Sequence, residues 1–301
     1  MTFRLLLGLF AVGLAGIGAG AANTDYRPDT VWPRGGATAP GYGAHPVSAA
    51  AVDGDGRLFL FHRAPLPVLV FDADGAYLRG WGQGQFTSPH GCRVGPDGSL
   101  WLTDSADHRV MKFSPEGRLL LTLGVKDEPG EDAAHFNRPT DVAFGPAGDI
   151  YISDGYGNAR IVRLDRNGKF VAAWGRKGSG EGEFNLPHSL VVDRRGRVLV
   201  ADRENARIQV FTADGRFLEQ WRDVGYPYGL ALTPDDRLIV TDGRSHHVSV
   251  HDLTGKRIVR FGAPGRKPGE LDLPHLAAVD GHGAVYICEV NGKRVQRFLP
   301  R

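Results

Sequence analysis

The chain has 301 residues, of which 42% are hydrophobic, and its 42 glycines are typical of many short strands joined by tight turns. This length is enough for one large all-β domain with a sizeable core. The 36 basic and 34 acidic residues give a formal net charge of +2 and are spread along the sequence without blocks. Charge therefore gives little support for binding to nucleic acid or to a membrane surface.

The N-terminus has the organisation of a secretory signal, which we place at residues 1–21. Arg4 is followed by the apolar stretch 5–17 and then by Ala19-Gly20-Ala21, a small-residue cleavage site. The alternative is an uncleaved anchor, because the apolar stretch continues to Ala22 and reaches the lower length limit for crossing a bilayer. We expect cleavage, a secreted or periplasmic protein, and no stable membrane insertion afterwards.

A unit of four strands repeats through the rest of the chain. In the fourth unit we expect strands at 189–193, 197–201, 207–211 and 217–221, with glycine in the turns between them. Each unit opens on a proline followed by an apolar strand. These prolines are Pro46, Pro89, Pro139, Pro187, Pro227 and Pro274. Six units predict a six-bladed β-propeller over residues 30–301, after a short lead at 22–29.

The last unit stops after its third strand, at Phe298. The N-terminal segment 30–35 resembles the blade-ending segment 78–82, so we expect it to supply the missing outer strand. Such a closure ties both termini into one blade and leaves no open sheet edge.

Histidine follows the opening proline in the second, fourth and sixth units, at His90, His188 and His275. The same position in the other units holds Val47, Thr140 and Tyr228. Alternate blades of a six-bladed ring are related by about 120°, so the three imidazoles are expected to converge on the axis. The alternative is that each histidine only hydrogen-bonds the start of a strand, but packing alone does not impose threefold alternation. Three neutral imidazoles with an open fourth position suit Zn²⁺ best.

An acidic residue recurs after the second strand of nearly every unit, where we expect it to bond backbone amides of the turn. These residues are Asp104, Asp154, Asp202, Asp242 and Glu289. The residues that follow vary, and variation within a repeat points to function. Arg203 and Arg63 stand at matching places in the fourth and first units, opposite each other, where they are placed to grip a carboxylate. Tyr156, in the third unit, is placed to act as a general base. The alternatives are two surface arginines and a surface aromatic residue.

The two cysteines, Cys92 and Cys288, fall in units that are separated by the first unit. We therefore expect no disulfide between them and interpret both as small buried apolar residues.

The units resemble NHL repeats over about residues 30–299, most clearly at the segment 202–208, Asp-Arg-Glu-Asn-Ala-Arg-Ile. Within that class, the chain is similar to peptidyl-α-hydroxyglycine α-amidating lyase, also called peptidylamidoglycolate lyase. The segments that carry this similarity are 139–143, 153–162, 174–175, 187–190 and 201–209, together with Pro89-His90-Gly91 and Pro274-His275.

That family cleaves the N–C bond of a C-terminal α-hydroxyglycine and releases a peptide amide and glyoxylate. The resemblance implies zinc held by the three histidines, Tyr156 as the base, and Arg203 and Arg63 as functional arginines. It also implies a C-terminally hydroxylated peptide, or a small α-hydroxy-amide, as the substrate. We expect the protein to act as a monomer without a nucleic-acid partner.

The sequence departs from the family pattern at four positions. Leu276 replaces an aspartate that is a calcium ligand, which argues against structural Ca²⁺, and Leu273 replaces a methionine next to the third histidine. Gly157 and Leu199 replace cysteines that brace the animal enzymes. Two alternatives stay open: a non-catalytic propeller that binds a protein or peptide, and a metal-dependent enzyme with another small α-hydroxy substrate.

Overall fold

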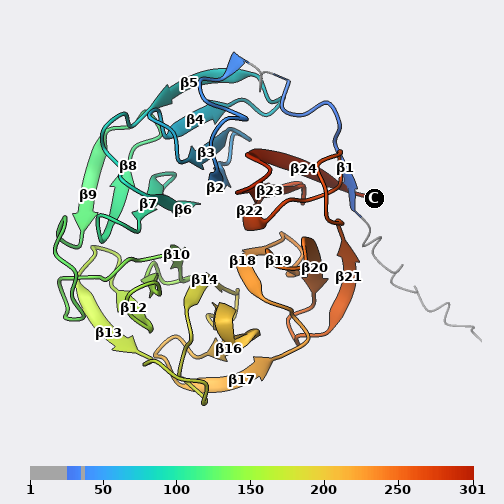
Figure 1. Ribbon diagram of the computed structural model, residues 1–301. Coiled ribbons are helices and arrows are strands. Elements are labelled where there is room, and N and C mark those ends of the chain that lie inside the picture. The colour runs from blue at the N-terminus through green and yellow to red at the C-terminus, as the bar shows by residue number, and fades with distance from the viewer. Residues whose placement is uncertain (1–25, 35–37) are drawn as a thin grey trace, which may run out of the picture.

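The computed structural model describes residues 26–34 and 38–301, which form six four-stranded antiparallel sheets arranged radially around one axis (Figure 1). This confirms the predicted all-β, six-bladed propeller. The expected signal at residues 1–21 lies outside the described residues. Within the described ranges, no helix has the length and apolar character needed to cross a membrane.

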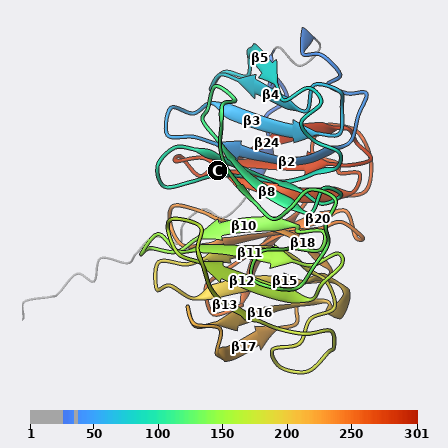
Figure 2. The ribbon, with the colours of Figure 1, turned by 90° about the vertical axis from the view of Figure 1, so that its left-hand side faces the viewer.

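In each blade the four strands follow one another from the axis to the rim, and Figure 2 shows the same disc from its side. Blade one contains β2 (Val47–Val52), β3 (Leu58–His62), β4 (Val68–Phe71) and β5 (Tyr77–Trp81). Blade two contains β6 (Pro89–Val94), β7 (Leu100–Asp104), β8 (Arg109–Phe113) and β9 (Leu119–Leu123). Blade three contains β10 (Asp141–Phe144), β11 (Ile150–Asp154), β12 (Arg160–Leu164) and β13 (Phe170–Trp174).

Blade four contains β14 (Pro187–Val192), β15 (Val198–Asp202), the short 3₁₀ helix η2 (Arg203–Asn205), β16 (Arg207–Phe211) and β17 (Phe217–Trp221). Blade five contains β18 (Pro227–Leu232), β19 (Leu238–Asp242), β20 (His247–His251) and β21 (Arg257–Phe261). Blade six contains β22 (Pro274–Val279), β23 (Val285–Glu289), β24 (Arg294–Pro300) and, at the rim, β1 (Tyr26–Pro28). In blade four, the third and fourth strands have the predicted bounds, whereas the first begins two residues early and the second is shifted by one.

The N-terminus closes the ring, but through a different segment from the predicted one. The closing strand is β1, in which Tyr26 pairs with Pro300 and Pro28 with Phe298 of β24. Asp29 then accepts a 2.9 Å hydrogen bond from Nε of Arg297. The propeller therefore includes residues expected to be a lead, and segment 30–35, of which residue 35 lies outside the described residues, is not the paired strand.

Trp32 explains why the later segment resembles a blade ending. At Gly117, in the β8–β9 turn, φ is +95° and a Cβ atom would lie 2.6 Å from the Trp81 ring of the preceding blade. Gly75 in blade one makes the same approach to Trp32, where a Cβ would lie 2.7 Å from the indole nitrogen. Trp32 thus provides the blade-to-blade contact of a rim tryptophan, although the backbone pairing lies at β1.

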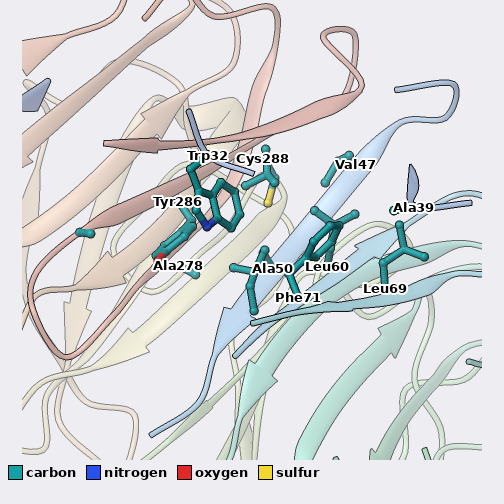
Figure 3. Close-up of a cluster of buried hydrophobic side chains, with 13 residues drawn as sticks. Trp32, Ala39, Val47, Ala50, Leu60, Leu69, Phe71, Ala278, Tyr286 and Cys288 are labelled. Atoms are coloured by element: carbon teal, nitrogen blue, oxygen red, sulfur yellow. The ribbon is translucent and has the colours of Figure 1, made fainter. Parts of the chain in front are cut away.

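Apolar side chains of neighbouring blades interdigitate to form the core. Between blades six and one, Trp32 packs edge-on against Tyr286, beside Cys288, Leu60 and Phe71 (Figure 3). Cys92 lies in the next cluster, between blades one and two. Both thiols are free and buried, as predicted, so hydrophobic burial rather than a cross-link holds these blades together.

Candidate metal centre

The three histidines predicted as ligands converge on the propeller axis. Strands β6, β14 and β22 each begin at a proline, and the next residue is His90, His188 or His275. Their potential ligand atoms all lie within 4.8 Å of one another, and their ring centroids are 4.8–4.9 Å apart. All three side chains are buried.

Backbone carbonyls fix which nitrogen of each imidazole faces the axis. His90 Nδ1 lies 2.6 Å from the Thr140 carbonyl oxygen, His188 Nδ1 2.6 Å from that of Tyr228, and His275 Nδ1 2.7 Å from that of Ser48. Each Nδ1 must donate its proton to the carbonyl, which leaves Nε2 with a free lone pair. The accepting carbonyls come from blades three, five and one. The blades that contribute no histidine therefore orient the imidazoles of the blades that do.

Burial keeps the three imidazoles uncharged. It is the main cause that lowers the pKa of His90 and of His188 well below its ordinary value, and it lowers the pKa of His275 to about 3. Positive charge on Arg203 lowers all three pKa values further. The site therefore presents three neutral nitrogen donors near neutral pH, the form in which imidazole binds a metal.

Tyr156, from the turn after β11, brings its hydroxyl into the middle of this set. The oxygen lies 3.0 Å from Nε2 of His90 and 3.0 Å from Nε2 of His188. The single phenol proton can bond only one of these two Nε2 lone pairs. Neither imidazole has another proton to offer the phenol, because each ring already donates its Nδ1 proton to a carbonyl. The three Nε2 lone pairs are therefore better satisfied by a bound cation than by hydrogen bonds within the site. Three nitrogen donors fit a zinc ion with an open coordination position.

The two predicted arginines reach the same site from opposite sides. Arg203 begins η2, and its guanidinium lies 4.5 Å from the Tyr228 ring centroid and 5.7 Å from that of Tyr156. Arg63 donates from Nε to the Ser48 hydroxyl at 3.1 Å. The charges of both arginines lower the pKa values of His90 and His275, so both lie close enough to act on these imidazoles.

Tyr228 is a site residue that reasoning from the sequence missed. The sequence showed only that it is no strong zinc ligand, yet its carbonyl orients His188 and its ring supports Arg203. The ring centroid lies 5.4 Å from that of His188 and 6.1 Å from that of His275. The signal was its place in the repeat, because Tyr228 occupies in blade five the position that the ligands occupy in alternate blades.

The recurrent acidic residues are structural, as expected, but within the described ranges only Asp104 and Asp242 of the five accept hydrogen bonds from backbone amides of the predicted turn. The carboxylates of Asp104, Asp154, Asp202 and Glu289 each accept a hydrogen bond from a backbone amide of the segment that enters the blade. Asp242 instead accepts bonds from the amides of Arg244 and Ser245. Asp154 and Asp202 also accept hydrogen bonds from the side chains of Asn158 and Asn205, in the loops from which Tyr156 and Arg203 project.

The departures from the family pattern have physical reasons. Leu276 is buried in the apolar cluster with Phe59 and Cys92, so this position supplies no oxygen ligand for calcium. A Cβ atom at Gly157 would lie 2.1 Å from the Asn137 side chain, which occupies the space that a larger residue needs. Leu199 packs in the core between blades four and five. Leu273 is half-buried, directly before the third histidine strand.

Comparisons with known proteins agree with this architecture. The NHL repeat family model matches residues 136–164 and 184–211. NHL repeat-containing protein 3 of Homo sapiens is 34% identical over 308 residues, covering 91% of this chain and 84% of that protein. A virginiamycin B lyase structure from Staphylococcus aureus has a TM-score of 0.60 and 18% identity, covering 91% of this chain and 84% of that one, which supports the fold alone.

Two relatives are named for peptide amidation. Peptidylglycine alpha-amidating monooxygenase of Rattus norvegicus is 33% identical over 84% of this chain. Peptidyl-alpha-hydroxyglycine alpha-amidating lyase 1 of Drosophila melanogaster is 33% identical over 76% of it. The chain spans only 30% of the length of the rat protein and 48% of that of the fly protein.

Proposed function

We propose that this chain, which belongs to the family of NHL-repeat proteins, is a zinc-dependent lyase that cleaves the N–C bond of a peptidyl-α-hydroxyglycine. The products would be a peptide amide and glyoxylate. The observation that carries the proposal is the position of the Tyr156 hydroxyl, 3.0 Å from two of three converging histidine nitrogens. Relatives named as amidating lyases support the choice of substrate.

His90, His188 and His275 would hold the ion through Nε2. When bound, zinc supplies Lewis-acid polarisation of the substrate hydroxyl. Arginine is suited to bind a carboxylate with two parallel hydrogen bonds, and Arg203 and Arg63 are placed to take the carboxylate of the hydroxyglycine. Because Arg203 is held by the Tyr228 ring and by a 2.9 Å hydrogen bond to Glu204, its guanidinium is oriented before substrate arrives.

Proton transfer would fall to Tyr156. Its oxygen, as the phenolate, takes the proton of the α-hydroxyl, and the electron pair of that O–H bond forms the carbonyl of glyoxylate. The pair of the breaking C–N bond goes to the amide nitrogen, which takes up the proton that Tyr156 removed and so restores the base. The two guanidinium groups stabilise the negative charge that develops during this collapse.

We also propose that the protein works outside the cytoplasm, as a secreted or periplasmic enzyme. The basis is the composition of the N-terminal segment, with Arg4, the apolar stretch 5–17 and the small residues 19–21.

The test is glyoxylate release from a short peptidyl-α-hydroxyglycine by the purified protein, measured as isolated, after chelation, and after zinc is restored. Release that is lost on chelation and regained with zinc supports the lyase. A protein that binds one zinc but releases no glyoxylate points to another small α-hydroxy substrate. A protein that binds no zinc points to the non-catalytic propeller.

A further inference from the structure

A largely buried guanidinium lies at the propeller axis, close to the three converging histidines. Arg93 lies on β6, three residues after His90, and only 16% of its side-chain surface is exposed. Its Nη2 donates to the Asp141 carboxylate at 2.6 Å and to the Leu230 carbonyl at 2.9 Å, and its Nε donates to the same carboxylate at 3.1 Å. Longer contacts reach the Ser189 hydroxyl at 3.3 Å and the Ala277 carbonyl at 3.5 Å.

These contacts join five blades at the axis. Arg93 belongs to blade two, and its acceptors Asp141, Ser189, Leu230 and Ala277 belong to blades three, four, five and six. The acceptors are a carboxylate, a hydroxyl and two backbone carbonyls. These are the kinds of oxygen that also coordinate a hard metal cation. A charged side chain supplies the cation here.

Each acceptor lies one or two residues from a part of the metal centre. Ser189 follows His188, and Ala277 lies two residues after His275. Asp141 follows Thr140, and Leu230 lies two residues after Tyr228. The carbonyls of Thr140 and Tyr228 are the ones that orient His90 and His188. The network therefore fixes the strands that set the position and the tautomer of the ligands.

The groups that contact Arg93 also hydrogen-bond to one another, so the network holds its members in one arrangement. Ser189 donates a 2.7 Å hydrogen bond to Asp141, and the Leu230 amide donates to Ser189 at 3.1 Å. Burial is the largest single effect and lowers the pKa of Arg93, but the charge and the hydrogen bonds of Asp141, together with smaller effects, leave that pKa above its ordinary value. A buried charge of this kind is tolerated only when its partners stay in place, so each partner strand is constrained.

We propose that Arg93 is a positioning residue of the metal centre. Its guanidinium is a fixed positive charge at the axis that holds the three strands carrying His90, His188 and His275 in place relative to one another. Residues that orient metal ligands through hydrogen bonds change metal affinity by about 10–100-fold when they are removed. This inference rests on the proposed zinc site, but not on the identity of the substrate.

The test compares Arg93→Gln with a matched control, Arg197→Gln. Arg197 also pairs with a buried aspartate, Asp193, at 2.7 Å, and the exposed fractions of the two side chains, 16% and 0%, equal those of Arg93 and Asp141. We expect Arg93→Gln to weaken zinc binding, measured by competition with a chromophoric chelator, by about 10-fold or more. Arg197→Gln should change it by less than about twofold, although both variants lower the Tm of the metal-free protein, and Arg93→Lys should recover part of the affinity.

Wild-type zinc affinity in folded Arg93→Gln would overturn the inference, as would an equal loss of affinity in Arg197→Gln. If Arg93→Gln does not fold, the double variant Arg93→Gln/Asp141→Asn removes both charges and takes its place, with the same expected loss. If the parent protein binds no zinc, the proposed function fails by itself. The axial role is then judged by the metal-free Tm, which Arg93→Gln must lower more than Arg197→Gln because it loses contacts to four blades.

Discussion

His188 and Tyr228 are joined through the backbone: Nδ1 of the imidazole donates to the Tyr228 carbonyl oxygen at 2.6 Å. The ring of the same tyrosine lies 4.5 Å from the guanidinium of Arg203. One residue thus connects a nitrogen donor of the candidate metal centre to the arginine that we propose binds the substrate carboxylate, and the two connections can be separated by mutation.

Replacing Tyr228 with leucine removes the ring and keeps the carbonyl. We expect unchanged zinc affinity and a KM raised about 3–10-fold, because a cation–π contact of about 0.5–2 kcal/mol that orients Arg203 is lost. Steady-state kinetics on peptidyl-α-hydroxyglycine measure this change. Tyr228→Phe keeps the ring and serves as the control, and a substrate with a carboxamide in place of the carboxylate should show no difference between the variants.

Tyr156→Phe removes the hydroxyl that lies 3.0 Å from His90 and His188. We expect full zinc occupancy with turnover reduced about 10²–10⁴-fold, since a general base typically contributes that much. Zinc content and glyoxylate release are measured on the same sample. Activity near that of the parent would exclude Tyr156 as the base.

His188→Ala should abolish stoichiometric zinc and turnover together, because two imidazoles leave the coordination incomplete. His251→Ala is a suitable control, since His251 is equally buried but lies on β20, away from the axis. Metal analysis after dialysis distinguishes the two variants. Full zinc occupancy in His188→Ala would refute the ligand set.

Metal-free protein should lose stability as the pH falls below about 6.5. The buried histidines are neutral in the folded state and take up protons when unfolded, so the unfolded state binds more protons and acid favours it. The loss should continue toward pH 3, since the pKa of His275 is lowered to about 3; His62, with a pKa lowered to about 4, acts in the same direction. Urea titrations at several pH values measure the slope, and His275→Asn should flatten it.

A chain that starts at Thr30 lacks β1 and Asp29, and its Tm should be lower than that of a chain that starts at Ala22. It loses the backbone pairing to β24, the stacking of Tyr26 on Phe261 at 5.1 Å, and the ion pair to Arg297. Asp29→Asn removes only the charge of that pair and should lower the Tm less, because the backbone pairing to β24 and the stacking of Tyr26 on Phe261 stay in place. Equal Tm values for the chains that start at Thr30 and at Ala22 would contradict closure by β1.

Local repetition made most of the fold predictable. Each blade repeats the same sequence of strand, glycine turn and strand, so the number of blades and most strand bounds can be read from neighbouring residues. The closing strand was misplaced because Trp32 looks like a rim tryptophan, and it packs on Gly75 as one. Backbone pairing at Tyr26–Pro28 has no comparable local signature, since it depends on where β24 ends.

The blade count and the alternation of His90, His188 and His275 can be read from the residues alone, because both are periodic and a ring converts a fixed period into a fixed angle. The three-dimensional contacts alone show which imidazole nitrogen faces the axis, that Tyr228 supports Arg203, and that Arg93 bonds to four other blades. The physical reason is that these contacts join different blades. Several of them end on backbone carbonyls, which every residue carries and no sequence pattern marks.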